Sequence, residues 1–278
     1  MIDGNTKVVG LIGNPVEHSL SPVMHNAAFK ELNLNYIYLP FMVEDNKLKN
    51  VIDGAESLNI KGLNVTIPHK INIIPYLDEL DPIAKLIGAV NTIDLKNKKG
   101  YNTDGIGALK AIEEIISLKN KKIVITGAGG SARAISFQIA NENIDNLVII
   151  NRNEDKAKSL SEDILKSNLN ENINYNSLDN LKNELCDADI FIDTTPLGLK
   201  PNDKPIATHD ILHEDLIVND IVYNPIKTPL LKEAEIANSK TISGIKMLLY
   251  QGAESFKIWT GINPPIDVME EVILKHVV

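Results

Sequence analysis

A glycine turn between an apolar run and a helical pattern constrains the fold of this chain more than any other feature. Gly127-Ala128-Gly129-Gly130-Ser131-Ala132 has the form G-x-G-x-x-A; it follows the apolar run Lys122–Thr126 and opens the helical pattern Ser131–Ala140. In such a turn, the first glycine permits the tight bend, the second lets the backbone approach a pyrophosphate, and the small last residue lets the helix lie close to the strand. N–H groups at the start of the helix bind the phosphates. We therefore expect a dinucleotide-binding unit, with a ligand-free glycine turn as the alternative.

Apolar, β-rich runs alternate with helical patterns through the rest of the chain. Nearly continuous apolar strands separated by helices are typical of parallel sheets covered on both faces, so we expect an α/β protein. The other expected strands are Val8–Ile12, Tyr36–Phe41, Leu63–Ile67, Val90–Leu95, Gly100–Tyr101, Leu147–Ile150, Asp189–Asp193 and Leu216–Ile221. The other expected helices are Pro22–Leu32, Lys47–Ser57, a short one from Pro68, Glu154–Lys166, Met247–Trp259 and Val268–Val277. The polar stretch Ser167–Asn176 is expected to be a loop.

The length of 278 residues suits two domains of ordinary size. We expect an N-terminal α/β domain over residues 1–104 that binds the substrate and carries the catalytic groups, and a Rossmann-type dinucleotide-binding domain over residues 105–243. Residues 244–278 are expected to form helices that pack back on the first domain.

Composition argues against several classes of partner and site. The formal net charge is -9 without a basic cluster, which argues against binding to nucleic acid or an anionic membrane. The single cysteine, Cys186, excludes an intrachain disulfide and suits a reducing cytosol. No basic and apolar leader follows Met1, and no apolar run approaches the roughly 18 residues of a membrane span. We expect a cytoplasmic protein that binds small molecules.

The segment Asn151-Arg152-Asn153 ends the second strand of the expected dinucleotide unit. An NAD site usually offers a carboxylate at this point, about twenty residues past the glycines, for the ribose 2′-hydroxyl. The guanidinium of Arg152 suits a 2′-phosphate instead, and Lys156 adds a second positive charge one helical turn later. These residues favour NADP. Glu154 lies close enough to act as the ribose carboxylate, so NAD stays open, and a solvated Arg152 is the structural alternative.

Several polar residues of the first half stand where structure alone does not require them. They are Ser19, Ser21, Thr66, Lys70, Asn91 and Asp104. Thr66 and Lys70 lie at the carboxyl end of an expected strand, the edge at which open parallel sheets bind ligands. Each also has a structural interpretation: Ser21 and Asp104 as helix caps, Lys70 as a solvated lysine. His18 and His69 are interpreted as ordinary loop histidines, and no spacing indicates a metal site.

Taken together, these segments resemble the motifs of the shikimate dehydrogenase family. The matching segments are Gly13–Pro15, His18–Pro22, Asn64–Lys70, Gly88–Thr92, Asn102–Gly105, the glycine turn, Asn151-Arg152, Tyr223–Pro225 and Met247–Ala253. They keep their order from about residue 8 to residue 256, nearly the whole chain. The resemblance implies a two-domain α/β enzyme that reduces 3-dehydroshikimate to shikimate reversibly with NADPH, on the route to chorismate and the aromatic amino acids, without a metal.

The resemblance also implies roles for residues of the substrate site. Those implied are Ser19, Ser21, Thr66, Lys70, Asn91, Asp104, Tyr223 and Gln251. Ser19 and Ser21 would hold the substrate carboxylate, while Thr66, Asn91 and Gln251 would hold ring hydroxyls, and Tyr223 would close the pocket from the cofactor side. Lys70 and Asp104 would be the catalytic pair beside the reacting C3 oxygen. Lys70 would carry the proton and stabilise the developing charge, and Asp104 would orient substrate and lysine.

On the cofactor side, the resemblance adds the loop Thr194–Gly198 beside the nicotinamide and apolar contacts from Met247 and Leu248. The full set expected to bind NADP is Gly127, Ala128, Gly129, Gly130, Ser131, Ala132, Asn151, Arg152, Asn153, Lys156, Thr194, Thr195, Pro196, Ile221, Gly244, Met247 and Leu248. Asn153, where the family often has threonine, and Glu154 depart from the family pattern. Rotation near Gly105, Gly107 and Gly244 would bring cofactor and substrate together.

Two alternative functions stay open at this point. One is a quinate/shikimate dehydrogenase that also uses NAD, which Glu154 would support. The other is a non-catalytic nucleotide-binding sensor that kept the fold, against which the presence of Lys70 and Asp104 argues. The expected partners are the small-molecule substrate and a second copy of the chain in a homodimer, with neither nucleic acid nor membrane.

Overall fold

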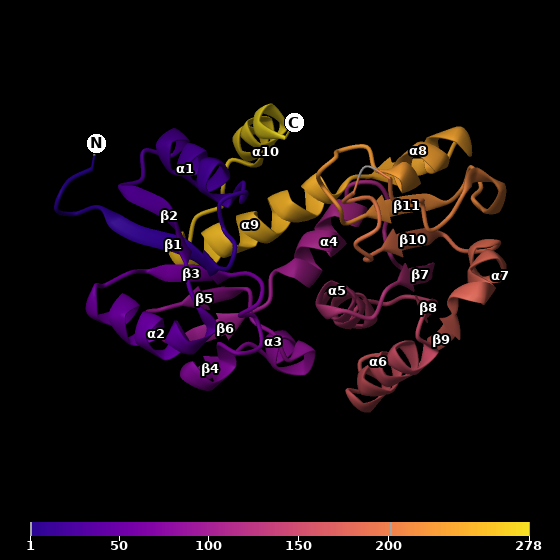
Figure 1. Cartoon of the computed structure of the whole chain (residues 1–278), viewed down its shortest axis with the longest axis horizontal. Coiled ribbons are helices and arrows are strands. Elements are labelled where there is room, and N and C mark those ends of the chain that lie inside the picture. The colour runs from indigo at the N-terminus through magenta and orange to yellow at the C-terminus, as the bar shows by residue number, and fades with distance from the viewer. Residues whose placement is uncertain (1, 201, 278) are drawn as a thin grey trace. The chain divides into compact units, whose positions relative to one another are not determined.

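The computed structural model describes residues 2–200 and 202–277, which form two compact units (Figure 1). The first unit holds residues 2–103 and 251–276, and the second holds residues 104–250 and residue 277. The later division falls inside helix α9 (Gly244–Thr260), so the first turns of this helix belong to the second unit. The expected returning segment began at residue 244, before this division.

The first unit is built on a mixed sheet in the order β2-β1-β3-β5-β6-β4. Strands β1, β2 and β3 are parallel, whereas β5 runs antiparallel to both β3 and β6. The strands are β1 (Lys7–Gly13), β2 (Tyr36–Met42), β3 (Gly62–Val65), β4 (Glu79–Leu80), β5 (Thr92–Asp94) and β6 (Lys99–Tyr101).

The helices of the first unit are α1 (Ser21–Glu31), α2 (Leu48–Ser57), α3 (Pro82–Ile87) and α10 (Ile266–His276), with 3-10 turns η1 (Asp45–Lys47) and η2 (Ile74–Tyr76). Helix α10 packs along α1, and the Trp259 indole near the end of α9 donates to the Ile93 carbonyl oxygen at 3.0 Å. A Cβ on Gly62 would lie 2.1 Å from that indole nitrogen, so only glycine admits the tryptophan here. These contacts place α10 and the end of α9 on the first unit, as expected.

The helix expected from Pro68 is absent, because residues 67–73 form a series of turns. The backbone N–H of Val90 donates to the Lys70 carbonyl oxygen at 2.8 Å. In a continuing helix that oxygen would accept from the N–H four residues later. The sequence prediction missed this because the competing donor comes from another segment.

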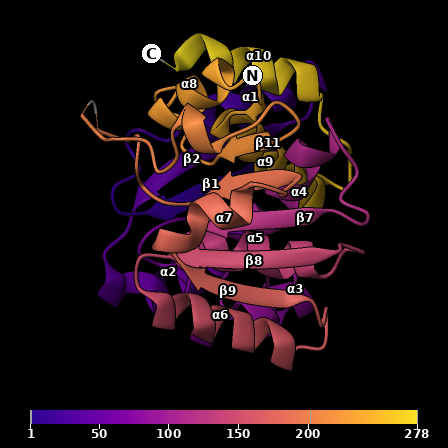
Figure 2. The same cartoon turned by 90° about the vertical axis from the view of Figure 1, so that its right-hand side faces the viewer.

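The second unit contains a fully parallel sheet in the order β12-β11-β10-β7-β8-β9 (Figure 2). This is the doubly wound dinucleotide-binding order. In such sheets ligands bind at the point where the strand order reverses, which here lies between β7 and β10. The strands are β7 (Lys122–Thr126), β8 (Asn146–Asn151), β9 (Ile173–Ser177), β10 (Ile190–Asp193), β11 (Ile217–Asp220) and β12 (Lys240–Ile242).

The helices of the second unit, besides the start of α9, are α4 (Asp104–Glu113), α5 (Gly130–Ala140), α6 (Glu154–Lys166), α7 (Leu181–Leu185) and α8 (Pro229–Ile236), with 3-10 turns η3 (Leu178–Asn180) and η4 (His209–Ile211). Helix α6 lies beside β8 and β9 (Figure 2). Helix α8 begins with Pro229 after Thr228, whose hydroxyl accepts from the Leu231 N–H at 3.3 Å. A side-chain cap followed by proline is a common way to start a helix.

Strand β9 corrects the loop expected at Ser167–Asn176. Only Ile173 of this strand is buried, while Tyr175 is exposed, so no apolar alternation marks it. It forms through backbone pairing with β8 at the edge of the sheet.

Burial in the second sheet follows the apolar pattern. Strands β10 and β11 are buried at every residue, and β7 at every residue but the first. Burying one such aliphatic side chain is worth about 1.5–3 kcal/mol, so these strands dominate the core. The last residue of each is polar and still buried: Thr126, Asp193 and Asp220.

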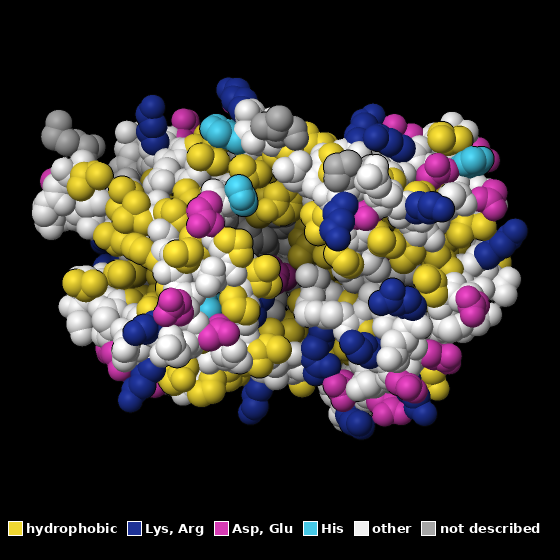
Figure 3. All heavy atoms as spheres, in the orientation of Figure 1, with side chains coloured by type: hydrophobic (Ala, Val, Ile, Leu, Met, Phe, Trp, Pro, Cys, Tyr) yellow, Lys and Arg dark blue, Asp and Glu magenta, His cyan; other side chains and the backbone are white. Residues whose placement is uncertain are grey.

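Basic and acidic side chains are interspersed on the face shown in Figure 3. Within the described residues, no helix combines the length and apolar character needed to span a membrane.

Candidate active site

The loops after β1, β2 and β3 meet at the carboxyl edge of the first sheet. The N–H of Asn14 donates to the Ile67 carbonyl oxygen at 3.0 Å, and the N–H of Val43 donates to the Gly13 carbonyl oxygen at 2.9 Å. A Cβ on Gly13 would lie 2.3 Å from the Thr66 methyl carbon, so this glycine lets Thr66 lie against the end of β1. The predicted residue Thr66 therefore lies at the edge where the topology places a ligand.

The predicted residues Lys70 and Asn91 are fixed to the same edge through their backbones. Val90 donates to the Lys70 carbonyl oxygen, and Val65 donates to that of Asn91, each at 2.8 Å. The Lys70 side chain is half-buried, whereas Asn91 is buried.

His69, next to Lys70, has a structural place. Its ring is fully buried, with Nε2 2.8 Å from the Val43 carbonyl oxygen and Nδ1 2.9 Å from Asp45 Oδ1. This ring ties the turn that carries Lys70 to the segment after β2, in agreement with its interpretation as a non-catalytic residue.

A buried polar network lies behind Asn91. Its Oδ1 accepts from the Thr103 N–H at 2.8 Å, which fixes the orientation of the amide. Asn64 Nδ2 donates to the Asn91 carbonyl oxygen at 3.1 Å and to Ser255 Oγ at 3.0 Å, and the Tyr38 hydroxyl donates to Asn64 Oδ1 at 2.8 Å. The sequence prediction did not assign Asn64, Tyr38 or Ser255 to this site. The available signal was Asn64 inside an apolar strand, where a polar side chain needs partners.

The other predicted substrate residues of the first unit lie on helices α1 and α9 or just before them. Ser21 is the buried first residue of α1, and its N–H donates to the Ser19 hydroxyl at 3.3 Å. Gln251, in α9, is half-buried, and its carbonyl oxygen accepts from the Ser255 hydroxyl at 3.0 Å. The network of Asn64 and Ser255 thus connects the backbone of Gln251 to that of Asn91.

Asp104 is the first residue of α4 and counts with the second unit, whereas Lys70 belongs to the first. Asp104 as a whole residue is 9% exposed. A negative charge at a helix N-terminus is stabilised by the unpaired N–H groups and the helix dipole.

The glycine turn of the second unit has the geometry that its motif predicts. Gly127 has φ +106°, and a Cβ there would lie 2.3 Å from Thr194 Oγ1. A Cβ on Gly129 or Gly130 would meet nothing within 4 Å, so the backbone at the start of α5 faces open space. Ala132 is fully buried against the sheet. These features fit a pyrophosphate bound by N–H groups at the start of α5.

The segment after β8 carries the residues predicted to select the cofactor. Arg152, Glu154 and Lys156 are all exposed. Asn151 Nδ2 donates to the Asn153 carbonyl oxygen at 2.9 Å, and the Asn153 side chain caps α6 by accepting from the Lys156 N–H at 3.4 Å. Because their side chains are exposed, Arg152 and Lys156 are accessible to a 2′-phosphate.

The remaining predicted cofactor residues lie on two further segments. Thr194 Oγ1 donates to the Thr126 carbonyl oxygen at 2.6 Å, which joins the Thr194–Gly198 loop to the glycine turn. A Cβ on Gly244 would lie 2.3 Å from the Ile221 carbonyl oxygen, so these two residues are in contact. Helix α9 begins at Gly244, earlier than the expected Met247, and carries buried Met247 and half-buried Leu248.

Three titratable groups near these loops have shifted pKa values. Burial raises the pKa of Asp193, and burial together with the nearby Asp193 charge raises the pKa of Asp220 to about 7. Burial also raises the pKa of the Tyr223 hydroxyl. In each case burial stabilises the neutral form relative to the same group in water. Over the described residues, no three His, Cys, Asp or Glu side chains are placed to hold a metal.

Comparison with known protein families covers most of the chain. The shikimate dehydrogenase substrate binding domain matches residues 11–93, the shikimate/quinate 5-dehydrogenase model matches residues 109–199, and the shikimate 5′-dehydrogenase C-terminal domain matches residues 244–274.

Individual relatives extend the similarity over the whole length. A shikimate dehydrogenase (NADP+) of Methanobrevibacter smithii is 61% identical over 277 residues, which cover 99% of each chain. A crystal structure of a shikimate dehydrogenase in complex with NADP+ has a TM-score of 0.94 at 51% identity, covering 100% of this chain and 98% of the other. A shikimate 5-dehydrogenase of Listeria monocytogenes in complex with shikimate and NAD has a TM-score of 0.92 at 40% identity over 98% of both chains. On this similarity, and on the motifs that the fold gathers at its sheet edges, the chain belongs to the shikimate dehydrogenase family.

Proposed function

We propose that this chain is an NADP-dependent shikimate dehydrogenase, which reversibly reduces 3-dehydroshikimate to shikimate in the biosynthesis of aromatic amino acids. The observation that carries the proposal is the 61% identity to a shikimate dehydrogenase (NADP+) over 99% of both chains. The polar residues of the first sheet edge and the open glycine turn support it, because the reaction needs both a polyol site and a dinucleotide site.

The proposed chemistry at the substrate rests on Lys70 and Asp104. NADPH, when bound, supplies a hydride to C3 of 3-dehydroshikimate. Negative charge then develops on the C3 oxygen, where the Lys70 ammonium stabilises it and transfers a proton. Asp104 orients the substrate and the lysine. In the reverse direction, Lys70 takes the proton back.

The other proposed contacts divide between the two units. Ser19 and Ser21 hold the substrate carboxylate, and Thr66, Asn91 and Gln251 hold ring hydroxyls, with Tyr223 closing the pocket. The cofactor phosphates bind at Gly127–Ala132, the 2′-phosphate binds Arg152 and Lys156, and the nicotinamide lies against Thr194–Pro196, Ile221, Gly244, Met247 and Leu248. Residues 1–104 and 105–243 would then be the substrate and cofactor domains, in a cytoplasmic homodimer.

The test follows absorbance at 340 nm with shikimate or quinate as substrate and NADP or NAD as cofactor. The proposal requires a fast rise in absorbance at 340 nm with shikimate and NADP. Comparable rates with quinate or with NAD would favour a quinate/shikimate dehydrogenase instead. That second candidate has support from exposed Glu154 beside Arg152 and from the Listeria relative, which was crystallised with NAD.

A further inference from the structure

Three polar residues stand side by side at the carboxyl ends of neighbouring strands in the second sheet. Asp193 at the end of β10 is in register with Thr126 of β7 on one side and with Asp220 of β11 on the other. Their exposed fractions are 1%, 0% and 0%. Two buried carboxyl groups on adjacent strands are costly unless hydrogen bonds compensate them. The bonds that they make therefore indicate what these residues do.

Asp193 joins the glycine turn to the Thr194–Gly198 loop. Its Oδ1 accepts from the Thr126 hydroxyl at 2.8 Å and from the Thr195 N–H at 2.9 Å. Its Oδ2 accepts from the Thr195 hydroxyl at 3.0 Å. The Asp193 side chain thereby holds Thr195, two positions later, in a fixed turn. Thr126 directly precedes Gly127, so one carboxyl group bonds both to the Thr194–Gly198 loop and to the residue that leads into the glycine turn.

Asp220 holds the loop that carries Tyr223 at both of its ends. Its Oδ1 accepts from the Val222 N–H at 3.0 Å, and its Oδ2 accepts from the Thr228 hydroxyl at 2.6 Å. Thr228 is the cap of α8, so its position is fixed by that helix as well.

We propose that Asp193 and Asp220 are positioning residues of the dinucleotide site: without touching either reactant, they hold the Thr194–Gly198 loop and the Tyr223 loop in the conformation that receives the nicotinamide end of the cofactor. The inference rests on the proposed function. Each carboxyl group accepts hydrogen bonds through both oxygens. Apart from Thr126 at the end of β7, the donors lie in the segments that follow β10 and β11.

Substitution by asparagine tests whether the two aspartates act through their hydrogen bonds or through their negative charge. An asparagine at either position keeps one oxygen for the backbone N–H. Its amide nitrogen can donate to the threonine hydroxyl that formerly donated to the carboxylate. Alanine keeps none of these bonds. If the residues act by positioning, asparagine substitutes for aspartate and alanine does not.

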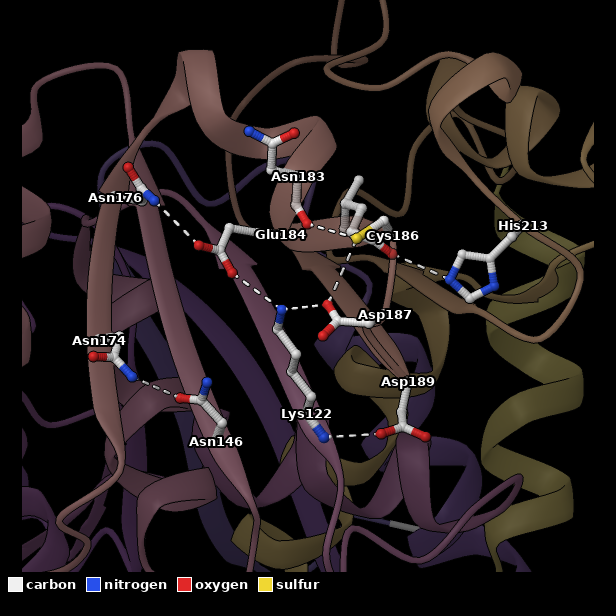
Figure 4. Close-up of polar contacts among 11 residues, drawn as sticks. Lys122, Asn146, Asn174, Asn176, Asn183, Glu184, Cys186, Asp187, Asp189 and His213 are labelled. Carbon is white, nitrogen blue, oxygen red and sulfur yellow. Dashed lines mark hydrogen bonds and ion pairs between the residues drawn. The ribbon is translucent and has the colours of Figure 1, made fainter.

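Asp189 provides a matched control at the opposite edge of the same sheet (Figure 4). Its Oδ2 accepts from the Lys122 N–H at 2.9 Å and its Oδ1 from Lys121 Nζ at 2.7 Å, so it too bridges β10 to β7. It lies at the amino end of β10, away from the cofactor loops. Asp189→Ala should lower stability without changing affinity for the cofactor.

The experiment measures the Kd for NADP by calorimetry, KM for NADP and for shikimate, kcat and melting temperature in each variant. Asp193→Ala and Asp220→Ala should raise the Kd and KM for NADP at least roughly tenfold, because the cofactor loops then lose the side-chain hydrogen bonds that hold them. Asp193→Asn and Asp220→Asn should stay within about threefold of the wild type, and KM for shikimate should change least. Thr126→Val and Thr228→Val, which remove one donor each while keeping the shape, should shift the Kd for NADP in the same direction as the alanine variants.

The inference fails if the alanine variants, or the valine variants where an alanine variant does not fold, lose only stability and bind NADP like Asp189→Ala. It also fails if the asparagine variants are as impaired as the alanine variants. The Kd for NADP can be measured without turnover. A wild type that binds NADP but does not oxidise shikimate would therefore refute the proposed function, and the variants would still decide this inference.

Discussion

Lys70 is the side chain on which the proposed chemistry depends most. Lys70→Ala should lower kcat by about 10²–10⁴-fold, the usual contribution of a positioned proton donor, since no other group would supply the proton. The Kd for NADP should not change, because Lys70 belongs to the substrate unit. Stopped-flow turnover and calorimetry measure the two effects, with Lys85→Ala on the exposed side of α3 as the control.

The opposite result would identify a different residue as the proton carrier. If Lys70→Ala kept most of its turnover while Asp104→Ala abolished it, Asp104 and not Lys70 would be the proton carrier.

Asp220 should make the stability of the protein depend on pH near neutrality. Burial raises its pKa to about 7 from the usual value of 3.8, so the folded state binds this proton more tightly than the unfolded state. The contribution of protonated Asp220 to the free energy of unfolding is therefore complete below about pH 4 and is lost as the pH rises through about 7. Asp220→Asn has no proton to lose, so its free energy of unfolding should fall less between about pH 5 and 8.

Urea unfolding of wild type and Asp220→Asn across this pH range measures the difference. Parallel curves would mean that Asp220 titrates at an ordinary pKa in the folded protein. Asp193→Asn is a useful companion, because Asp193 contributes to the raised pKa of Asp220.

At the scale of single residues, the sequence could predict where Lys70 and Thr66 lie, because a recognisable apolar strand ends beside them. Their roles stay predictions. The support from Tyr38, Asn64 and Ser255 could not be predicted, because these residues are far apart in the chain and meet only when α9 lies on the first sheet. Asp193 and Asp220 ended apolar runs, and an acid at that point was the signal that sequence reasoning left unused.

The glycine turn is the element whose geometry leaves least freedom. Gly127→Ala should weaken NADP binding by more than about tenfold and lower the melting temperature, because φ +106° strains an L residue and the new Cβ would clash with Thr194 Oγ1 at 2.3 Å. Gly54→Ala is the control: it lies in α2 with nothing within 4 Å of the added Cβ. It should stabilise the protein by up to about 1 kcal/mol. Equal NADP affinity in wild type and Gly127→Ala would refute the assignment of this turn.

The start of α6 is the element that should select the cofactor. Arg152→Gln should raise KM for NADP by roughly tenfold or more while leaving KM for NAD almost unchanged, because a bidentate charged contact to the 2′-phosphate is lost. Lys156→Gln should act in the same direction and more weakly. Steady-state kinetics with both nucleotides measure this selectivity. A parallel rise in KM for NADP and NAD would show that Arg152 contacts a part common to both.

Most of the longer strands and helices could be predicted from hydrophobic pattern. The elements of the structure that were not among the expected ones are β4, β9, β12, α3, α4, α7 and α8. Strand β9 escaped because an edge strand with only Ile173 buried has no apolar alternation. The turn at Pro68 was mistaken for a helix because proline also opens helices, and only the bond from Val90 to the Lys70 carbonyl oxygen decides between them. Such partners lie outside any window of sequence.

At the scale of the whole molecule, the chain passes between its two units at residues 103–104 and again inside α9. Two of the glycines expected to absorb a rotation, Gly105 and Gly244, have close packing neighbours in this structure. A Cβ on Gly105 would lie 2.4 Å from the Ala134 carbonyl oxygen, so this glycine lets α4 pack against α5. A rotation of the two units on binding stays a prediction, and matching unit orientations in free and fully bound crystals would contradict it.

The central claim is that this chain reduces 3-dehydroshikimate with NADPH. The most direct measurement mixes purified protein with both reactants, follows the loss of absorbance at 340 nm, and identifies the product by mass spectrometry. The account predicts one shikimate formed for each NADPH consumed, with much slower consumption of NADH. A protein that binds NADPH but consumes none of it in the presence of 3-dehydroshikimate would contradict the account and would favour a nucleotide-binding sensor of the same fold.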